Sequence, residues 1–405
     1  MARRALSRHT ARDDGRPLRR GWQRAARPIV VLLVAASVGV AAAEQLPPGD
    51  IARRAEDARQ ARRIDEALGL YREALAAQPH WAEGWFQLGT LLYDRDACGE
   101  AAAAFRRSAA LQPGIGTTWV MLGLCEFQLG QKQEALQHIQ HGRGLGVSAD
   151  PQFRHVMLFH EGLLLLDAGE FERAQQTLGI LAAEGVWTDE LAVALGRAVL
   201  LAGGEQPNTG PAVERRVIER AGGAERLAAQ RKLAEARRAY EQLAAEFPAT
   251  PNVHYALGRH LAAVKQPDAA VSAFEQEIRK APRHVPARLN IAAIKSRTDP
   301  GAALALAEEA VRLNPRIPLG HYLLGSLLLE TPDVERAIAE LEIARQTVPA
   351  DPGVHFALAR AYTRAKRPEE AARARATFKR LTEERQAAAR RDASQPPAGA
   401  SSPPQ

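Results

Sequence analysis

The sequence repeats itself with a period of 34 residues, and this period constrains the fold more than any other feature of the chain. Prolines mark the period most plainly. Three pairs of prolines stand 34 positions apart: Pro79 and Pro113, Pro248 and Pro282, and Pro315 and Pro349. Self-similarity at a fixed period of this length is typical of a repeat array, in which each unit buries its apolar face only by stacking on its neighbours.

Each unit carries small and bulky apolar residues at fixed positions. One unit shows the whole set, which is Trp85, Leu88, Gly89, Ala101, Phe105 and Pro113. Corresponding residues recur in the same frame around Gly123, Gly258, Gly325 and Ala359. The unit therefore reads as two antiparallel helices, with Gly89 and Ala101 small where the helices cross and Phe105 filling the space beside the crossing. The terminal proline ends the second helix because it lacks an N–H group and would clash with the preceding turn.

These residues and their spacing resemble the tetratricopeptide repeat, and the resemblance covers roughly residues 48–385. It implies an all-α fold, a right-handed α-solenoid of about eight to nine helix pairs that spans residues 44–387. It also implies that the first helix of each pair, helix A, lines a concave groove in which partners of this family usually lie. The repeat serves many kinds of partner, so the resemblance predicts the fold more sharply than the function.

Departures from the period locate the irregular parts of the array. The first helix A, residues 51–62, is polar, as expected of a capping unit. Between Gly196 and Gly258 lie 62 residues rather than two full periods. A glycine-rich stretch interrupts the pattern there, so we expect an irregular segment at residues 203–224 with a lost or distorted helix.

Local signals predict the limits of two further segments. Thr250 and Pro251 read as the N-cap and the first residue of a helix A. Residues 388–405 end in a stretch rich in serine and proline. This composition predicts a disordered tail.

The formal charge of +7 comes entirely from the N-terminal leader. Residues 1–28 hold nine arginines and only two acidic residues, Asp13 and Asp14, whereas the rest of the chain is neutral. A neutral body has no general attraction for a phosphate backbone. We therefore expect no nucleic-acid partner.

The basic leader continues into an apolar segment without charge, residues 28–43, which Glu44 ends. A positive start, a short apolar core and small residues at Ala41 and Ala43 are the pattern of a cleavable signal peptide, residues 1–43. An apolar helix of this length spans about 24 Å, less than the roughly 30 Å of a bilayer core, so we favour cleavage over a retained signal anchor. Either way the body lies outside the cytoplasm, in a bacterial periplasm, with membrane contact only through an uncleaved signal segment.

No signature of catalysis is present in the sequence. It contains no phosphate-binding loop, paired-histidine metal motif, nucleophile elbow or dinucleotide-binding fingerprint. His254, His321 and His355 share one position of helix A, but neighbouring units place them about 20 Å apart, too far for one metal ion. We therefore predict no catalytic residues, no metal site and no cofactor.

Aromatic residues recur at a helix A position that faces the groove in this family. Five units carry one: Phe86, Phe159, Tyr255, Tyr322 and Phe356. One interpretation is that these rings only shield the groove, and the other is that they form an apolar ladder for an extended segment or helix of a partner. Arg259 and Arg360 lie one turn later, where they could grip carboxylates. The lysine and asparagine clamp of chaperone-binding relatives is absent, so that class of partner is not carried over.

The only two cysteines, Cys98 and Cys125, fall in neighbouring units. Cys98 begins a helix B, and Cys125 lies late in the next helix A, so the antiparallel helices place the two side chains near each other. In an oxidising compartment a disulfide between them is one interpretation. Two buried thiols are the other.

Taken together, these features predict a non-catalytic scaffold or adaptor that binds a protein or peptide partner in the concave groove. Two alternatives stay open. One is a regulatory subunit of an envelope glycosyltransferase or secretion system, which differs from the scaffold only in its partner. The other is an enzyme whose catalytic residues are scattered over the groove or over residues 203–224.

A reporter fusion tests the export prediction. Residues 1–60 joined to a reporter that is active only outside the cytoplasm should give an active product, because the leader directs the attached chain outward. N-terminal sequencing of the exported chain should find a mature start near Glu44. Activity of a cytoplasm-specific reporter would contradict export, and an intact N-terminus on exported protein would identify a signal anchor.

Overall fold

The computed structural model describes residues 49–202 and 212–394, which form helices joined by short turns and contain no strand. The helices before residue 203 are α3 (Asp50–Gln60), α4 (Ile64–Ala77), α5 (Ala82–Asp94), α6 (Cys98–Leu111), α7 (Gly116–Gln128), α8 (Lys132–Leu145), α9 (Pro151–Asp167), α10 (Phe171–Ala183) and α11 (Asp189–Val199). Those after residue 211 are α12 (Ala212–Ala229), α13 (Leu233–Glu246), α14 (Val253–Ala263), α15 (Pro267–Lys280), α16 (Val285–Lys295), α17 (Pro300–Leu313), α18 (Pro318–Leu328), α19 (Val334–Thr347), α20 (Pro352–Arg364) and α21 (Pro368–Ser394).

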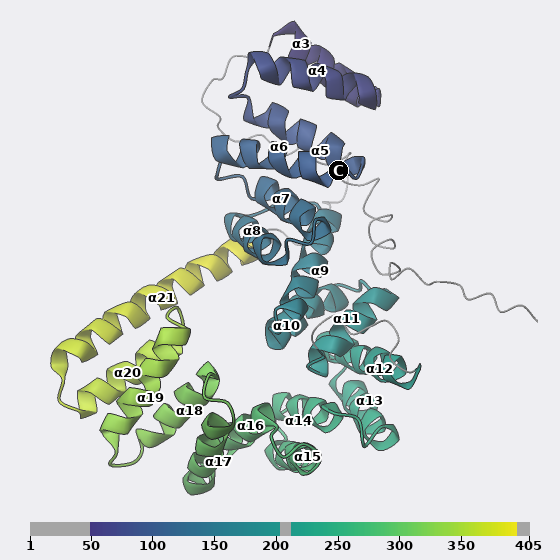
Figure 1. Ribbon diagram of the computed structural model, residues 1–405. Helices are drawn as coiled ribbons and strands as arrows, with labels where there is room; N and C mark the ends of the chain where they lie inside the picture. The colour runs from purple at the N-terminus through teal and green to yellow at the C-terminus, as the bar shows by residue number, and fades with distance from the viewer. Residues whose placement is uncertain (1–48, 203–211, 395–405) are drawn as a thin grey trace, which may run out of the picture.

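Within the described residues the helices form nine antiparallel pairs. The remaining helix, α11, is not followed by a helix B of its own and packs on α12, the first helix of the next pair. The pairs follow one another along an arc, with α14 and α16 on its inner side and α15 and α17 on its outer side (Figure 1). We name α3–α11 the first array and α12–α21 the second array. The predicted all-α solenoid of about eight to nine helix pairs is confirmed.

Close helix crossings at glycine hold several of the pairs together. A β-carbon at Gly89 in α5 would lie 2.8 Å from the ring of Phe105 in α6. At Gly258 in α14 it would lie 2.6 Å from the ring of Phe274 in α15. Both distances are shorter than van der Waals contact, so only glycine lets the bulky residue of helix B fill the crossing.

A second recurring contact links each helix A to the end of the preceding unit. Trp85 and Trp119 each donate an indole N–H to the carbonyl of the proline six residues earlier, at 3.0 and 2.8 Å. His321 and His355 occupy the same repeat position and donate from Nε2 to the equivalent proline carbonyls, at 2.9 and 2.8 Å. The imidazole therefore replaces the indole as the donor that sets the spacing between units.

Residues 203–211 of the predicted irregular segment lie outside the described residues. Twelve residues, 200–211, separate the end of α11 at Val199 from the start of α12 at Ala212, fewer than the 14 residues of a helix B such as α6. The prediction of distortion was wrong for the rest of the segment, because residues 212–229 form one continuous helix. α11 packs directly on that helix, and a β-carbon on Gly196 would overlap the carbonyl oxygen of Ile218.

The second array begins with the same polar contact as the first. Tyr71 in α4 donates its hydroxyl to Glu56 in α3, and Tyr240 in α13 donates to Glu225 in α12, both at 2.7 Å. Each pair is separated by 15 residues. The guanidinium of Arg59 beside Glu56 lowers the pKa of that carboxyl to about 2, so it is ionised at neutral pH.

Two residues distinguish these starting helices. Where α3 carries exposed Arg53 and Arg54, the corresponding positions of α12 are Gly222 and Gly223. The arginines give α3 the polar outer face predicted for a capping unit. Gly222 leaves α12 without a side chain at the point where the backbone of α11 approaches it, whereas Gly223 has open space around it.

The last helix continues farther than the sequence pattern predicts. α21 runs to Ser394, so the prediction of a disordered tail from residue 388 was wrong for residues 388–394. The segment from Glu383 is rich in alanine, arginine and glutamate, which favour a helix even without packing. The predicted signal peptide, residues 1–43, and the remainder of the predicted tail lie outside the described residues. In the part of the chain that is described, no helix is both long and apolar enough to cross a membrane.

Two adjacent glycines of α12 give a matched test of the joint, by which we mean the contact between α11 and α12. The substitution Gly222→Ala should destabilise the protein by about 1–3 kcal/mol, because the new methyl group overlaps the carbonyl oxygen of Ala192. Gly223 has open space around it, so Gly223→Ala should stabilise the helix by up to about 1 kcal/mol. Urea unfolding followed by circular dichroism measures both. Equal effects of the two substitutions would contradict the close approach of α11 and α12.

Candidate functional site

The predicted aromatic ladder is not one continuous surface. Phe86, Phe159 and Tyr255 are buried, with only 7%, 3% and 2% of their surface exposed. Phe86 packs edge-on against Phe105, with ring centroids 5.6 Å apart. Burial leaves these three rings no apolar surface for a partner, so the ladder prediction is corrected at these positions: they are core residues.

The first array covers the inner face of α14, which explains the burial of Tyr255. Asn252, just before α14, donates its side-chain N–H to the carbonyl of Leu200 at 2.7 Å. Leu201 packs against the apolar cluster that contains Tyr255. Arg259 of α14 lies 3.9 Å from the carboxylate of Glu172 in α10. The guanidinium predicted to grip a partner is therefore partly engaged within the chain.

An exposed apolar strip remains on α18, α20 and α21. Leu319 and Phe356 are half exposed, at 52% and 50%, and Tyr322 is partly exposed. Leu319 and Tyr322 lie on one face of α18 because they are three residues apart. The ring of Phe378 in α21 lies 5.4 Å from that of Phe356.

Gly353 connects the two halves of this strip. A β-carbon at Gly353 would lie 3.4 Å from the hydroxyl oxygen of Tyr322, and Gly353 is three residues before Phe356 on the same helix. The hydroxyl of Tyr322 therefore reaches the helix that carries Phe356, one turn before that residue. We call the surface made by Leu319, Tyr322, Phe356 and Phe378 the open face.

Arginines border the open face. Arg360 donates to Glu330 at 2.9 Å, and Arg364 donates to the carbonyl of Thr331 at 3.1 Å. Both members of the Arg360–Glu330 pair are at least half exposed, so water weakens the pair. A carboxylate on a partner can therefore compete for Arg360 at little cost.

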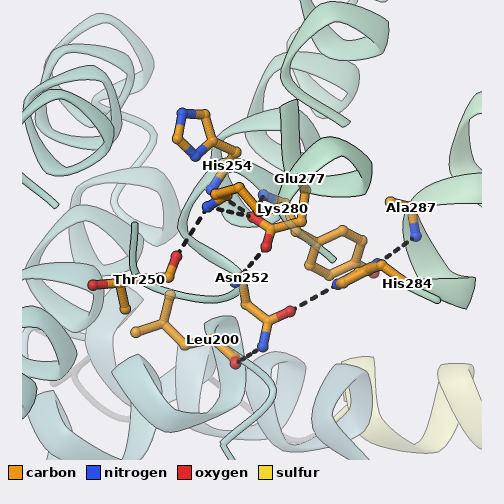
Figure 2. Close-up of polar contacts among 9 residues, drawn as sticks. Leu200, Thr250, Asn252, His254, Glu277, Lys280, His284 and Ala287 are labelled. Atoms are coloured by element: carbon orange, nitrogen blue, oxygen red, sulfur yellow. Dashed lines mark hydrogen bonds and ion pairs between the residues drawn. The ribbon is translucent and has the colours of Figure 1, made fainter. Parts of the chain in front are cut away.

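The repeat pattern did not predict the buried carboxylate of Glu277 in α15. Glu277 is fully buried and accepts hydrogen bonds from the backbone N–H groups of Asn252, His254 and Tyr255, at 2.9, 3.1 and 3.2 Å. Lys280 lies 3.3 Å from the same carboxylate (Figure 2). Glu277 thus satisfies the free N–H groups at the start of α14 from a neighbouring helix.

The sequence did contain a signal for this carboxylate. The equivalent position of helix B is uncharged in other units, where it is Ser108, Gly142, Leu181, Leu243, Ala310 or Ala344. A glutamate at a position that is otherwise uncharged indicates a polar role in the interior, because an unpaired buried carboxylate would be costly.

Asn252 differs from the predicted start of α14. It lies in the left-handed region, with φ 66°, and is the N-cap residue, so the prediction of Thr250 and Pro251 as cap and first helical residue was wrong. Its side-chain oxygen accepts a hydrogen bond from Nε2 of His284 at 2.7 Å. Figure 2 shows the Asn252 side chain between Leu200 and His284.

Both cysteines are buried in the structure. Cys98 donates to the side-chain oxygen of Gln128 at 2.9 Å. Burial raises the pKa of Cys125, which keeps that sulfur protonated and unreactive. The disulfide and the pair of buried thiols both stay predictions, and the thiol titration below distinguishes them.

Several histidines in the described residues contact a carboxylate or a backbone carbonyl. His138 lies 2.6 Å from Glu126, and His160 contacts the carbonyl of Val156 at 2.8 Å. In the same residues no group of three or more His, Cys, Asp or Glu side chains is arranged to hold a metal ion.

The family comparison agrees with the repeat frame. A tetratricopeptide-repeat profile matches residues 53–114, 86–141, 221–285, 296–353 and 333–377, which together make up more than half of the chain. The chain belongs to the tetratricopeptide-repeat family. The unmatched stretch, residues 142–220, holds α9, α10 and α11, so the helices that depart most from the family pattern are those that approach the joint between the arrays.

Solved structures of other helical arrays are similar to parts of this chain. MamA from Desulfovibrio magneticus RS-1 is 21% identical, and the match covers 42% of this chain and 96% of that one with a TM-score of 0.37. A chain of the APC/C hetero-tetramer Cut9-Hcn1 is 13% identical over 84% of this chain and 88% of that one, with a TM-score of 0.39. No curated protein sequence matches the chain.

A thiol titration tests the state of the cysteines. The native protein should react with a chromogenic thiol reagent at neither cysteine, because Cys98 and Cys125 are 6% and 0% exposed. After unfolding in urea without a reductant, two thiols per chain should react. Reaction of unfolded protein only after a reductant is added would show that the disulfide forms.

Proposed function

We propose that this protein is a non-catalytic interaction scaffold of the bacterial cell envelope, and that a segment of a partner protein binds to its open face. Repeats of this family generally bind proteins rather than catalyse reactions. The proposal rests on the exposure of Leu319, Tyr322 and Phe356. Phe86, Phe159 and Tyr255, at the same repeat position as Tyr322 and Phe356, are buried.

The chemistry of the open face defines the partner segment. Large rigid aromatic side chains dominate binding energies at protein interfaces, so Tyr322 and Phe356 would anchor apolar residues of the segment. Arg360 at the edge would receive a carboxylate. The segment is therefore apolar with an acidic residue beside its apolar stretch.

The envelope setting rests on the leader. A basic segment followed by an uncharged apolar stretch is what an export signal requires, and the neutral body after it suits a role that does not involve nucleic acid. A regulatory subunit of an envelope glycosyltransferase or secretion system would use the same surface with a different partner.

Comparative affinity capture from envelope fractions tests the proposal. The double variant Leu319→Ala/Phe356→Ala should bind the partner at least tenfold more weakly, because each truncation removes about 1–2 kcal/mol at a well-packed interface. The matched control is Ile343→Ala, which removes an apolar side chain of 40% exposure from α19. Quantitative mass spectrometry compares the proteins captured by the three forms, and circular dichroism verifies that each form is folded.

The outcomes separate clearly. Proteins that the wild type and Ile343→Ala retain, and that the double variant loses, support the open face as the binding site. Equal capture by the folded double variant would place binding elsewhere and overturn the proposal.

A further inference from the structure

Asn252 joins the two arrays through its side chain. It donates to the carbonyl of Leu200, at the end of α11, and accepts from Nε2 of His284, at the start of α16, with both contacts at 2.7 Å. Its backbone is held at the same time by Glu277. We call the chain of hydrogen bonds Leu200–Asn252–His284 the latch (Figure 2).

The latch requires a neutral imidazole. Nε2 of His284 donates to the amide oxygen of Asn252, and Nδ1 accepts the backbone N–H of Ala287 at 3.0 Å, which caps α16. A neutral ring with its hydrogen on Nε2 satisfies both contacts. A second proton on Nδ1 would point at the N–H of Ala287, so the cap would be lost and the ring would be displaced.

Groups on every adjoining segment bear on this ring. Burial lowers the pKa of His284, and Arg288 and Lys280 act in the same direction, whereas Glu277 opposes them. Arg288 is itself paired with Glu309 of α17. The ring of Tyr255 lies 4.9 Å from the imidazole.

We propose that the latch is a pH-responsive catch: neutral His284 holds the end of α11 over the inner face of α14, and protonation of His284 releases it. Release uncovers the inner face of α14 around Tyr255, which the end of α11 otherwise helps to cover. The chain would then present a second stretch of inner surface in addition to the open face. The binding of a partner to this second stretch rests on the proposed function, whereas the release of α11 on protonation of His284 does not.

The sign of the effect follows from the lowered pKa. In the open form the imidazole is exposed to water and has its ordinary pKa, near 6.5. In the closed form burial holds the pKa below that value, so protons bind more strongly to the open form. Closure is fully favoured above about pH 6.5 and weakens as the pH falls through the interval between the two values.

Hydrogen exchange of the full chain, without any partner, tests the catch. Backbone amides of residues 197–202 should be protected at about pH 7.5 and exchange at least about fivefold faster at about pH 5, after correction for the intrinsic effect of pH. Amides of α6 in the first array should keep their protection at both pH values. Faster exchange throughout the chain would mean global unfolding and would overturn the proposal.

Three variants assign the effect to the latch. Asn252→Gly keeps the left-handed backbone but removes the side chain, so residues 197–202 should exchange quickly at both pH values. His284→Asn keeps a capping oxygen for α16 but cannot titrate, so it should also abolish the pH dependence. His254→Asn is the matched control, because burial lowers the pKa of His254 too but its ring is outside the latch. This variant should retain the wild-type response.

Two results would overturn the catch. One is a His284→Asn protein whose residues 197–202 still respond to pH as the wild type does. The other is a wild-type segment with the same protection at both pH values. Neither result bears on the capture experiment at Leu319 and Phe356, so failure of the catch and failure of the proposed function are distinguishable.

Discussion

The close crossing of two helices at a small residue is the interaction on which the rest of this structure depends. At Gly89 and Gly258 the backbone of helix A approaches so near to helix B that an aromatic ring of helix B occupies the space of the missing side chain. No single pair made in this way has a complete core, so each pair must stack on the next. The N–H groups of Trp85 and His321 then fix the distance between units through the carbonyl of the preceding proline.

The same constraint explains why the chain contains two arrays. α3 and α12 are equivalent helices, with equivalent Glu–Tyr hydrogen bonds, yet α3 is the first helix that the structure describes and α12 lies inside the solenoid. Arg53 gives α3 a hydrated outer face, whereas Gly222 at the same position of α12 removes the side chain and admits the backbone of α11. The difference between arginine and glycine at this one position thus distinguishes a helix with a hydrated outer face from a helix that packs on the preceding array. The hydrogen bonds of Asn252 and Glu277 fix the angle between the two arrays, because hydrogen bonds are directional, whereas apolar packing alone would permit several angles.

Much of the fold was accessible from the sequence because its causes are local. The period, the small residues at the crossings and the polar first helix all follow from residues within one or two units. Errors arose where local signals compete. Thr250 and Pro251 resemble a helix start, but Glu277 of another helix caps α14 two residues later. The tail was predicted from its serines and prolines, although the alanines and arginines before them extend α21.

For the candidate site, too, part of the answer is local and part depends on the tertiary structure. The sequence by itself determined which residues occupy the groove-facing position of each helix A, because that position is set by the repeat frame. Only the tertiary structure decided which of them a partner can reach. Tyr255 and Phe356 stand at the same repeat position, yet they are 2% and 50% exposed. The difference comes from α10 and α11, which approach α14 from more than 50 residues away in the sequence and do not cover α20. The curvature that brings these helices to α14 belongs to the stack of units and not to any single unit.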